Sequence, residues 1–304
     1  MHGRILKGIA GFYYVEAKNE RVYECKAKGI FRKAGIKPMV GDDVEIEIID
    51  EEKGLGNLTD ILPRRNSLIR PPVANVDQAV ILFAIVKPDP NYNLLDRFLI
   101  MMRQQELPVI ICFNKQDIAT KQEQQELYDA YEKCGYKVLF VSVLEERGLD
   151  ELKALLRGKT STLAGPSGVG KSSLLNKLVP DADMQTGELS RKIDRGRNTT
   201  RHSELFYVKE LSDDREETYI IDTPGFTSLE LRNVTCDSLM NYYPEFEKYE
   251  PLCRFGGCSH IAEPDCGVKD AIRDGKVAKV RYDNYRILYQ DLKNMKPDYS
   301  RKGR

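Results

Sequence analysis

One eight-residue segment constrains the fold of this 304-residue chain more than any other part. Residues 165 to 172 read GPSGVGKS, which matches the phosphate-binding pattern GxxxxGK[ST]. An apolar segment, TSTLAG (160–165), precedes it, and SSLLNKL (172–178) follows it with helical periodicity. Glycines let backbone N–H groups point at phosphate oxygens, and a helix amino terminus favours negative charge. The segment therefore predicts a strand, a phosphate-binding loop and a helix within an α/β fold.

The loop assigns roles to individual residues. We expect Lys171 to reach the β- and γ-phosphates of a nucleotide and Ser172 to bind Mg²⁺. The residues expected to touch the nucleotide here are Gly165, Ser167, Gly168, Val169, Gly170, Lys171, Ser172 and Ser173.

A second motif, DTPG (222–225), follows the apolar segment TYIID (218–222). We expect Asp222 to hold Mg²⁺ through water and the N–H of Gly225 to sense the γ-phosphate. Upstream lies a polar stretch, residues 184–203, in which Thr199 or Thr200 would complete the magnesium shell. Its position between the phosphate loop and DTPG predicts that this stretch is a nucleotide-sensing switch loop. The alternative is an ordinary solvated loop.

A third motif, NKQD (114–117), follows the apolar segment PVIICF (108–113). Asn114, Lys115 and Asp117 match the pattern NKxD, in which the aspartate accepts hydrogen bonds from the ring N–H and the exocyclic amine of guanine. Adenine lacks both donors, so it would leave the carboxylate unpaired. Ser142 ends the apolar segment KVLFVSV (137–143), where a backbone N–H would reach the guanine carbonyl. Together with the phosphate loop, these residues predict a GTP site.

The order of the three motifs is unusual. Conventional GTPases place the phosphate loop first, then the switches and DxxG, and NKxD last. Here NKxD and Ser142 precede the phosphate loop, so the same sheet is expected in circularly permuted order. The switch after Gly225 then leads directly into the C-terminal region, which is a physical route from phosphate state to flanking domains.

Hydrophobic patterning divides the chain into three parts. Segments 3–17, 21–31 and 42–52 are short and rich in Val, Ile, Tyr and Phe, so residues 1–66 predict an OB-type five-stranded barrel, with another small β-module as the alternative. Residues 67–232 alternate apolar strands with amphipathic helices at 93–105, 119–134, 149–157 and 171–178, the pattern of a parallel sheet covered by helices. Residues 233–304 predict a helical domain with a long charged helix from about 268 to 294.

Four metal-ligating residues lie close together in the C-terminal part. Cys253, Cys258, His260 and Cys266 have the spacing C-x4-C-x-H-x5-C. Three thiolates and one imidazole suit tetrahedral Zn²⁺, and four protein ligands leave no open position for catalysis. The alternative is a set of free surface thiols.

Composition excludes several classes of protein. Hydrophobic residues make up 41% of the chain and charged residues 31%, as in an ordinary globular protein. The formal net charge is +0, so only a local basic patch would bind nucleic acid. The longest apolar run, residues 79–86, is too short to cross a bilayer, and the first residues lack a signal-peptide core. Seven cysteines do not make a disulfide scaffold, so we expect a reducing, cytoplasmic environment. We also expect a monomer without membrane contact.

These features together resemble the ribosome small-subunit-dependent GTPase A family over essentially the whole chain. The sequence is close to that of the family in three segments: GPSGVGKSSLLN (165–176), TTRH (199–202) and DTPGF (222–226). The resemblance implies that the Cys/His cluster is a structural zinc site. It also implies GTP hydrolysis to GDP, stimulated by the small ribosomal subunit and its rRNA, with a role in late maturation of that subunit.

The group that orients the attacking water is an open question. Conventional GTPases place a glutamine after DxxG, but Phe226 occupies that position and forms no hydrogen bond through its side chain. The family usually has histidine before the two threonines, whereas this chain has Asn198, which orients water but accepts no proton. His202 is the other local candidate, and the alternative for it is a plain switch-loop residue. We therefore take Asn198, His202 and Thr200 as catalytic candidates and expect slow hydrolysis by the isolated chain.

Two basic sets are candidates for contact with rRNA phosphates. One lies in the switch stretch, at Arg191, Lys192, Arg195, Arg197 and Arg201, and the other at Lys276, Lys279, Arg281 and Arg286. The alternative for both is a solvated charged face. Two other functions compete with the main one: a GTP-gated binding module whose hydrolysis only resets it, and an ATP-using enzyme such as a small kinase, against which NKxD argues.

Overall fold

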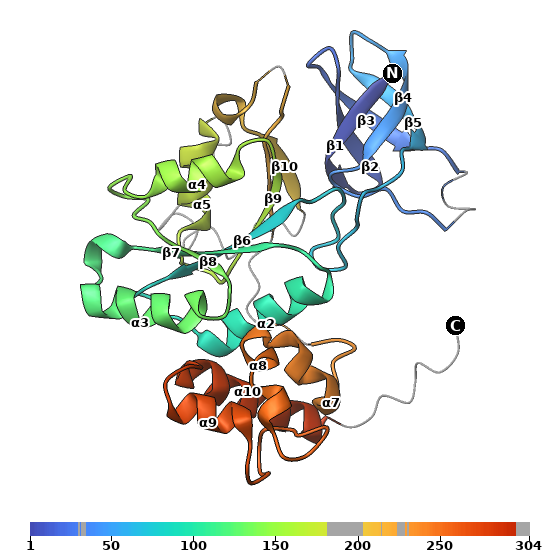
Figure 1. The fold of residues 1–304 in the computed structure, drawn as a ribbon. Helices are drawn as coiled ribbons and strands as arrows, with labels where there is room; N and C mark the ends of the chain where they lie inside the picture. The colour runs from blue at the N-terminus through green and yellow to red at the C-terminus, as the bar shows by residue number, and fades with distance from the viewer. Residues whose placement is uncertain are drawn as a thin grey trace, which may run out of the picture. The chain divides into compact units, whose positions relative to one another are not determined.

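The computed structural model describes residues 1–29, 31, 35–180, 203–213, 215–223, 229 and 231–295 (Figure 1). The switch candidates Asn198, Thr199, Thr200, His202 and Gly225 lie outside these residues, as does Phe226. The described chain forms two compact units: residues 1–82 with 141–227, and residues 83–140 with 228–304.

The first unit contains a closed five-stranded barrel. Its strands are β1 (His2–Ile9), β2 (Phe12–Ala17), β3 (Val22–Ala27), β4 (Asp43–Asp50) and β5 (Leu55–Ile61). They pair in the order β2-β3-β5-β4-β1, and β1 closes the barrel on β2. Alternate side chains point inward, so that Ile5, Tyr23 and Leu58 are fully buried, each contributing about 1.5–3 kcal/mol by apolar burial. The predicted OB-type barrel is confirmed.

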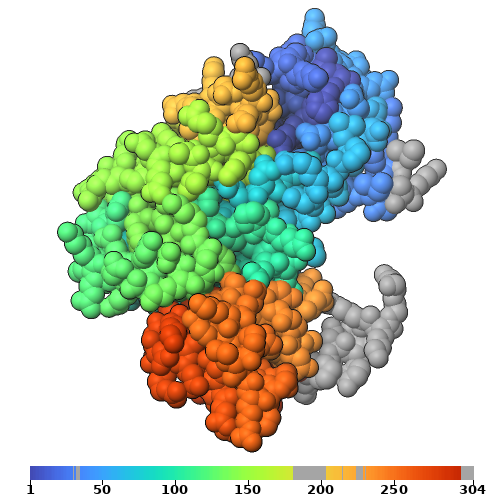
Figure 2. Space-filling model, in the orientation of Figure 1, coloured from blue at the N-terminus to red at the C-terminus, as the bar shows by residue number. Residues whose placement is uncertain are grey.

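The first unit also contains most of an α/β sheet. Strand β9 (Thr160–Ala164) pairs in parallel with β6 (Gln78–Ala84) on one side and β11 (Tyr219–Asp222) on the other. Strand β10 (Glu204–Tyr207) is antiparallel to β11, and barrel strand β1 is antiparallel to β10. The segments around β1 and β10 adjoin on the surface, dark blue against yellow-orange (Figure 2). Helices α4 (Leu149–Leu156) and α5 (Lys171–Leu178) and the 3-10 turn η3 (Lys209–Leu211) complete this unit.

Strand β6 runs from the first unit into the second. There, β7 (Val109–Asn114) pairs in parallel with β8 (Lys137–Phe140), accompanied by α2 (Tyr92–Gln104), η1 (Gln116–Ile118) and α3 (Lys121–Glu132). Local sequence sets where these helices begin. The Asn91 side chain accepts the Leu94 N–H at the start of α2, and Thr120 with Glu123 forms a capping box before α3.

The C-terminal region of the second unit is helical, as predicted. Its elements are α7 (Cys236–Leu239), η4 (Met240–Tyr242), α8 (Pro244–Glu247), η5 (Glu250–Leu252), α9 (Gly267–Arg273) and α10 (Lys279–Asn294). The single helix predicted from about 268 to 294 is wrong, because the chain breaks between α9 and α10. Gly275 follows α9 with φ +70°, a left-handed conformation typical of a glycine after a helix end.

Candidate nucleotide and metal sites

The phosphate loop joins β9 to α5, as the sequence predicts. Gly165 leaves the strand so close to β6 that a Cβ there would lie 2.1 Å from the Leu82 carbonyl oxygen. Gly168 and Gly170 have φ +81° and +100°, the left-handed region that glycine enters without steric cost. Gly170 is the residue from which α5 begins, so the amino terminus of that helix faces the loop.

Lys171 and Asp222 form the charged part of this site. Lys171 Nζ donates to the carbonyl oxygens of Gly165 (2.8 Å) and Pro166 (2.7 Å). Burial lowers the pKa of Lys171, and Asp222 opposes that shift. Burial likewise raises the pKa of Asp222 to about 6, and Lys171 opposes it. Both charged groups are thus desolvated beside each other, the environment in which a phosphate and a cation would be held strongly.

Sheet register places Asp222 and Thr223, the first two residues of DTPG, beside the strand that leads into the phosphate loop. Asp222 pairs with Leu163 across the parallel strands β11 and β9. Thr223 Oγ1 then donates to the Leu163 carbonyl oxygen at 2.8 Å. The carboxyl ends of the two strands therefore lie at the same end of the sheet, and Asp222 lies at the end from which the phosphate loop departs.

The NKQD segment lies in the second unit, at the carboxyl end of β7. Asn114 is buried, and its carbonyl oxygen accepts the Ile85 N–H at 2.9 Å. Lys115 has φ +68°, and its Nζ donates to the Lys87 carbonyl oxygen. Asp117 lies in η1, and Gln116 Nε2 ties this turn to the Phe140 carbonyl oxygen at 3.2 Å.

Ser142 follows β8 and lies in the first unit. Its N–H donates to the Arg147 carbonyl oxygen at 2.9 Å, and its Oγ accepts the Glu145 N–H at 3.1 Å. The Ser142 amide is thus already used within its own turn. A guanine contact by this amide stays a prediction from sequence position.

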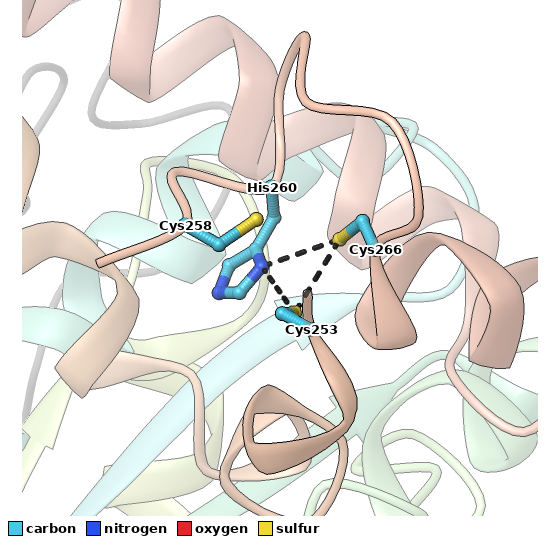
Figure 3. A group of neighbouring side chains, drawn as sticks. All are labelled: Cys253, Cys258, His260 and Cys266. Atoms are coloured by element: carbon cyan, nitrogen blue, oxygen red, sulfur yellow. Dashed lines mark hydrogen bonds between the residues drawn. The ribbon is translucent and has the colours of Figure 1, made fainter. Parts of the chain in front are cut away.

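The metal cluster is assembled in the C-terminal helical region (Figure 3). Cys253, Cys258, His260 and Cys266 each offer one ligand atom, and the four atoms lie within 4.8 Å of one another. Cys253 Sγ is 3.8 Å from Cys266 Sγ, and His260 Nδ1 is 3.6 Å and 3.4 Å from these sulfurs. Tetrahedral zinc with Zn–S bonds of about 2.3 Å separates two sulfurs by about 3.8 Å, so the donor set fits a metal such as zinc.

Protonation chemistry also fits a cation at this cluster. Burial lowers the pKa of His260, which favours the neutral imidazole that ligates metals. Burial raises the pKa of the Cys258 thiol to about 12, so thiolate forms there only beside a cation. His260 Nε2 is buried and, among the described residues, has no hydrogen-bond partner. Nδ1 points at two of the sulfurs while Nε2 points away, which makes Nδ1 the ligand atom (Figure 3).

Surrounding groups hold the cluster loop in shape. Tyr282 and Tyr285, both on α10, donate their hydroxyls to the carbonyl oxygens of His260 and Ser259 at 2.7 Å each. The Glu263 carboxylate accepts bonds from the Ser259 N–H and hydroxyl and from the Ile261 N–H. Partial burial alone would raise the pKa of Glu263, but these bonds lower it to about 2. The carboxylate therefore stays ionised as a fixed acceptor for the loop.

A second buried polar cluster was not identifiable from sequence. Arg281 on α10 is fully buried and donates to Asp96 on α2 at 2.5 Å and to Glu245 on α8 at 2.8 Å. Asn284 Nδ2 donates to Asp96 at 2.9 Å, and the Tyr131 hydroxyl of α3 donates to Asp96 at 3.3 Å. Burial raises the pKa of Asp96 to about 6, opposed by Arg281.

This cluster corrects one assignment from sequence. Arg281 is neither a phosphate-binding residue nor part of a solvated face, because its charge is enclosed by carboxylates inside the unit. Lys276, Lys279 and Arg286 are exposed, although Lys276 and Lys279 pair with Asp274 and Asp283. The first basic set, within residues 191–201, lies outside the described ranges.

Within the described ranges, none of the helices has the length and apolar character that crossing a membrane requires.

A phosphate loop follows β9, the sequence DTPG begins with the last residue of β11, and NKQD begins with the last residue of β7, earlier in the chain. This arrangement defines a circularly permuted P-loop GTPase. Comparison with known families agrees: the RsgA GTPase model matches residues 61–232, and the RsgA N-terminal domain model matches residues 2–55. The chain belongs to the RsgA GTPase family.

Relatives resemble the chain over nearly its whole length. The small ribosomal subunit biogenesis GTPase RsgA of Agathobacter rectalis is 57% identical, covering 97% of this chain and 99% of its own. The protein of the same name from Alkaliphilus metalliredigens is 47% identical, with coverages of 96% and 97%.

Two solved structures share the fold. YjeQ from Thermotoga maritima has a TM-score of 0.78 at 33% identity, covering 97% of this chain and 99% of its own. YloQ, described as a circularly permuted GTPase, has a TM-score of 0.74 at 36% identity, with coverages of 98% and 96%.

Proposed function

We propose that this GTPase acts on the small ribosomal subunit, in its late maturation, and that contact with the subunit and its rRNA stimulates GTP hydrolysis. The relatives named small ribosomal subunit biogenesis GTPase, at up to 57% identity over 97% of this chain, carry this proposal. The protein would work in the cytoplasm as a monomer, with residues 1–66 as barrel, 67–232 as GTPase domain and 233–304 as zinc-binding domain.

Nucleotide binding is assigned to the sequence motifs. The phosphates would be held by the backbone of Gly165, Ser167, Gly168, Val169 and Gly170 and by the side chains of Lys171, Ser172 and Ser173. Guanine would be read by Asn114, Lys115 and Asp117, with Ser142 near its carbonyl. Ser172 and Thr200 would bind Mg²⁺, with Asp222 holding it through water and Thr199 and Gly225 close to the γ-phosphate. When bound there, Mg²⁺ would neutralise negative charge on the phosphate oxygens.

Hydrolysis requires water to attack the γ-phosphorus as the bond to the β–γ bridging oxygen breaks, giving GDP and inorganic phosphate. Lys171 would stabilise negative charge on the phosphate oxygens. The side chain of Phe226 forms no hydrogen bond to that water, so Asn198, His202 or the ribosome must orient it. Slow turnover by the isolated chain follows from this assignment.

Zinc is assigned a structural role. Cys253, Cys258, His260 and Cys266 would supply all four ligands, so no position remains for a substrate. The cluster would fix the loop between η5 and α9 and thereby shape the surface of the C-terminal domain.

The deciding experiment is GTP turnover by the purified protein alone, with small ribosomal subunits, and with large ones. We expect slow turnover alone, a strong increase with small subunits and a weaker response to large subunits. Equal turnover in all three samples would contradict the proposal.

A GTP-gated binding module is the competing function. Subunit binding measured with GTP and with a non-hydrolysable analogue separates the two. In a binding module, both ligands support subunit binding equally, and only GTP allows release, because hydrolysis resets the module.

A further inference from the structure

One row of residues crosses the sheet from the barrel to the phosphate site. Lys7 of β1 pairs with Glu204 of β10, Glu204 pairs with Asp222 of β11, and Asp222 pairs with Leu163 of β9. Neighbouring strands in a sheet lie about 5 Å apart, so each member of the row contacts the next. The row links the barrel to the ends of the strands that lead into the phosphate loop and DTPG.

Lys7 is the one positively charged residue in this row, which also holds two carboxylates. Glu204 and Asp222 stand directly opposite each other on antiparallel strands, and two like charges in that arrangement repel. Lys7 Nζ lies 3.0 Å from Glu204 Oε1, on the side away from Asp222. The lysine therefore offsets a repulsion that the register of β10 would otherwise impose beside the phosphate site. Both side chains are about one-third exposed, so the ion pair is accessible to solvent.

A barrel irregularity makes this contact possible. The pairing of β1 with β2 shifts register between Ile5 and Lys7, where a bulge adds one residue. Ile5 points into the barrel core, and without the bulge Lys7 would share its face. The bulge re-aims Lys7 outward to β10.

Arg4 makes a parallel contact at the opposite ends of two of these strands. Its guanidinium donates to Thr160 Oγ1 at 2.9 Å and lies 4.4 Å above the Tyr219 ring. Thr160 begins β9 and Tyr219 begins β11, and the two residues pair across the strands. Arg4 thus contacts both strands that lead into the phosphate motifs, while Lys7 contacts β10 beside them.

We propose that Lys7 is a positioning residue for GTP hydrolysis, which acts by holding Glu204 and therefore the register of β10 beside Asp222. In this arrangement the barrel is a structural part of the phosphate site, because its first strand extends the GTPase sheet. The proposal rests on the GTPase activity of the chain and not on the ribosomal partner.

Charge exchange tests the pair in the full-length protein, with intrinsic GTP turnover measured at varied GTP concentration. We expect Lys7→Glu and Glu204→Lys each to lower kcat by about fivefold, the scale of one exposed ion pair, with KM changed less than about twofold. The double variant should recover kcat. Hydrogen exchange at the β10 amides should be faster in each single variant and restored in the double variant.

The matched control is another exposed barrel pair, Lys28 with Glu47, 2.9 Å apart. Exchanging its charges should leave kcat and β10 exchange unchanged, because neither residue lies on a strand that pairs with β10. A double Lys7–Glu204 variant no better than the worse single variant would overturn the proposal. An equal loss in the Lys28→Glu variant would also overturn it, since that result indicates a general effect of barrel charge.

The same variants also distinguish a direct contact between Lys7 and the ribosome. If Lys7 instead contacts rRNA phosphate, Lys7→Glu weakens binding of small subunits, Glu204→Lys does not restore it, and intrinsic turnover stays unchanged. Failure of subunit stimulation in the parent protein would count against the proposed function alone, because the intrinsic measurements do not use subunits.

Discussion

At the scale of single residues, we expect guanine specificity to depend on one carboxylate, Asp117. In the NKxD arrangement it accepts two hydrogen bonds that only guanine donates. Asp117→Asn exchanges an acceptor for a donor, which suits the carbonyl that xanthine has in place of the guanine amine. We expect GTP affinity to fall by about 10- to 100-fold and xanthosine triphosphate to bind better than it does to the parent. Nucleotide competition measures both, and equal binding of ATP and GTP by the parent would refute the assignment.

The residue that orients the attacking water is tested at Asn198. General acid–base help is worth about 100- to 10,000-fold, and positioning by an amide gives less. Asn198→His should therefore raise subunit-stimulated turnover while GTP affinity stays nearly constant. If His202 does this work instead, Asn198→His changes little and His202→Ala abolishes stimulation. If neither variant changes turnover, the ribosome supplies the group and both residue assignments are wrong.

Asp96 makes stability depend on pH. Its folded-state pKa of about 6 lies above the ordinary value of 3.8, so the folded protein binds the extra proton between these values. The resulting stabilisation is fully present below about pH 4 and is lost as pH rises through about 6. In nucleotide-free protein, Asp96→Asn should flatten the fall in unfolding free energy over this range, measured by urea denaturation. Asp291→Asn, which removes the half-exposed partner of Arg97, is the matched control and should keep the fall.

At the scale of helices and strands, the pattern of apolar and polar residues predicted most of the fold, because that pattern is a property of each short segment. The strands expected at 160–165 and 218–222 occur as β9 and β11, and the helix expected at 171–178 is α5. The break between α9 and α10 was missed, because helical periodicity continues across Gly275 and a single glycine is tolerated within many helices. The cluster around Arg281 was also missed. Its partner Asp96 lies 185 residues away in sequence, and a charged residue such as arginine is ordinarily predicted to lie on the surface.

The metal loop offers a test at this scale. Cys258→Ser removes one of the four proposed zinc ligands, and a structural zinc site contributes folding free energy directly. We expect loss of stoichiometric zinc and faster hydrogen exchange in α9 and α10, with GTP affinity changed less than about threefold, since the nucleotide motifs lie elsewhere in the chain. Cys236→Ser is the matched control, because that thiol is in the same domain but outside the cluster. Absence of stoichiometric zinc in the parent would refute the metal assignment.

At the scale of the whole molecule, the chain balances 47 basic against 47 acidic residues, so its overall field does not attract a polyanion. The proposed binding to rRNA would then depend on a few local basic groups, each of which displaces counterions from a phosphate. The apparent affinity for small subunits, taken from the subunit concentration at half-maximal stimulation, should fall steeply as salt rises from about 50 to 200 mM, with a logarithmic slope near the number of phosphates contacted. Intrinsic turnover without subunits should change little over the same range, because desolvated groups such as Lys171 are screened less than exposed ones.

Replacing Lys276 and Lys279 together by alanine tests one exposed basic set. A salt-dependence slope lowered by about two assigns both lysines to phosphate contacts. An unchanged slope shows that both lysines belong to a solvated charged face, where they pair with Asp274 and Asp283. Subunit affinity independent of salt in the parent protein would contradict binding through rRNA and would point to a protein surface of the subunit.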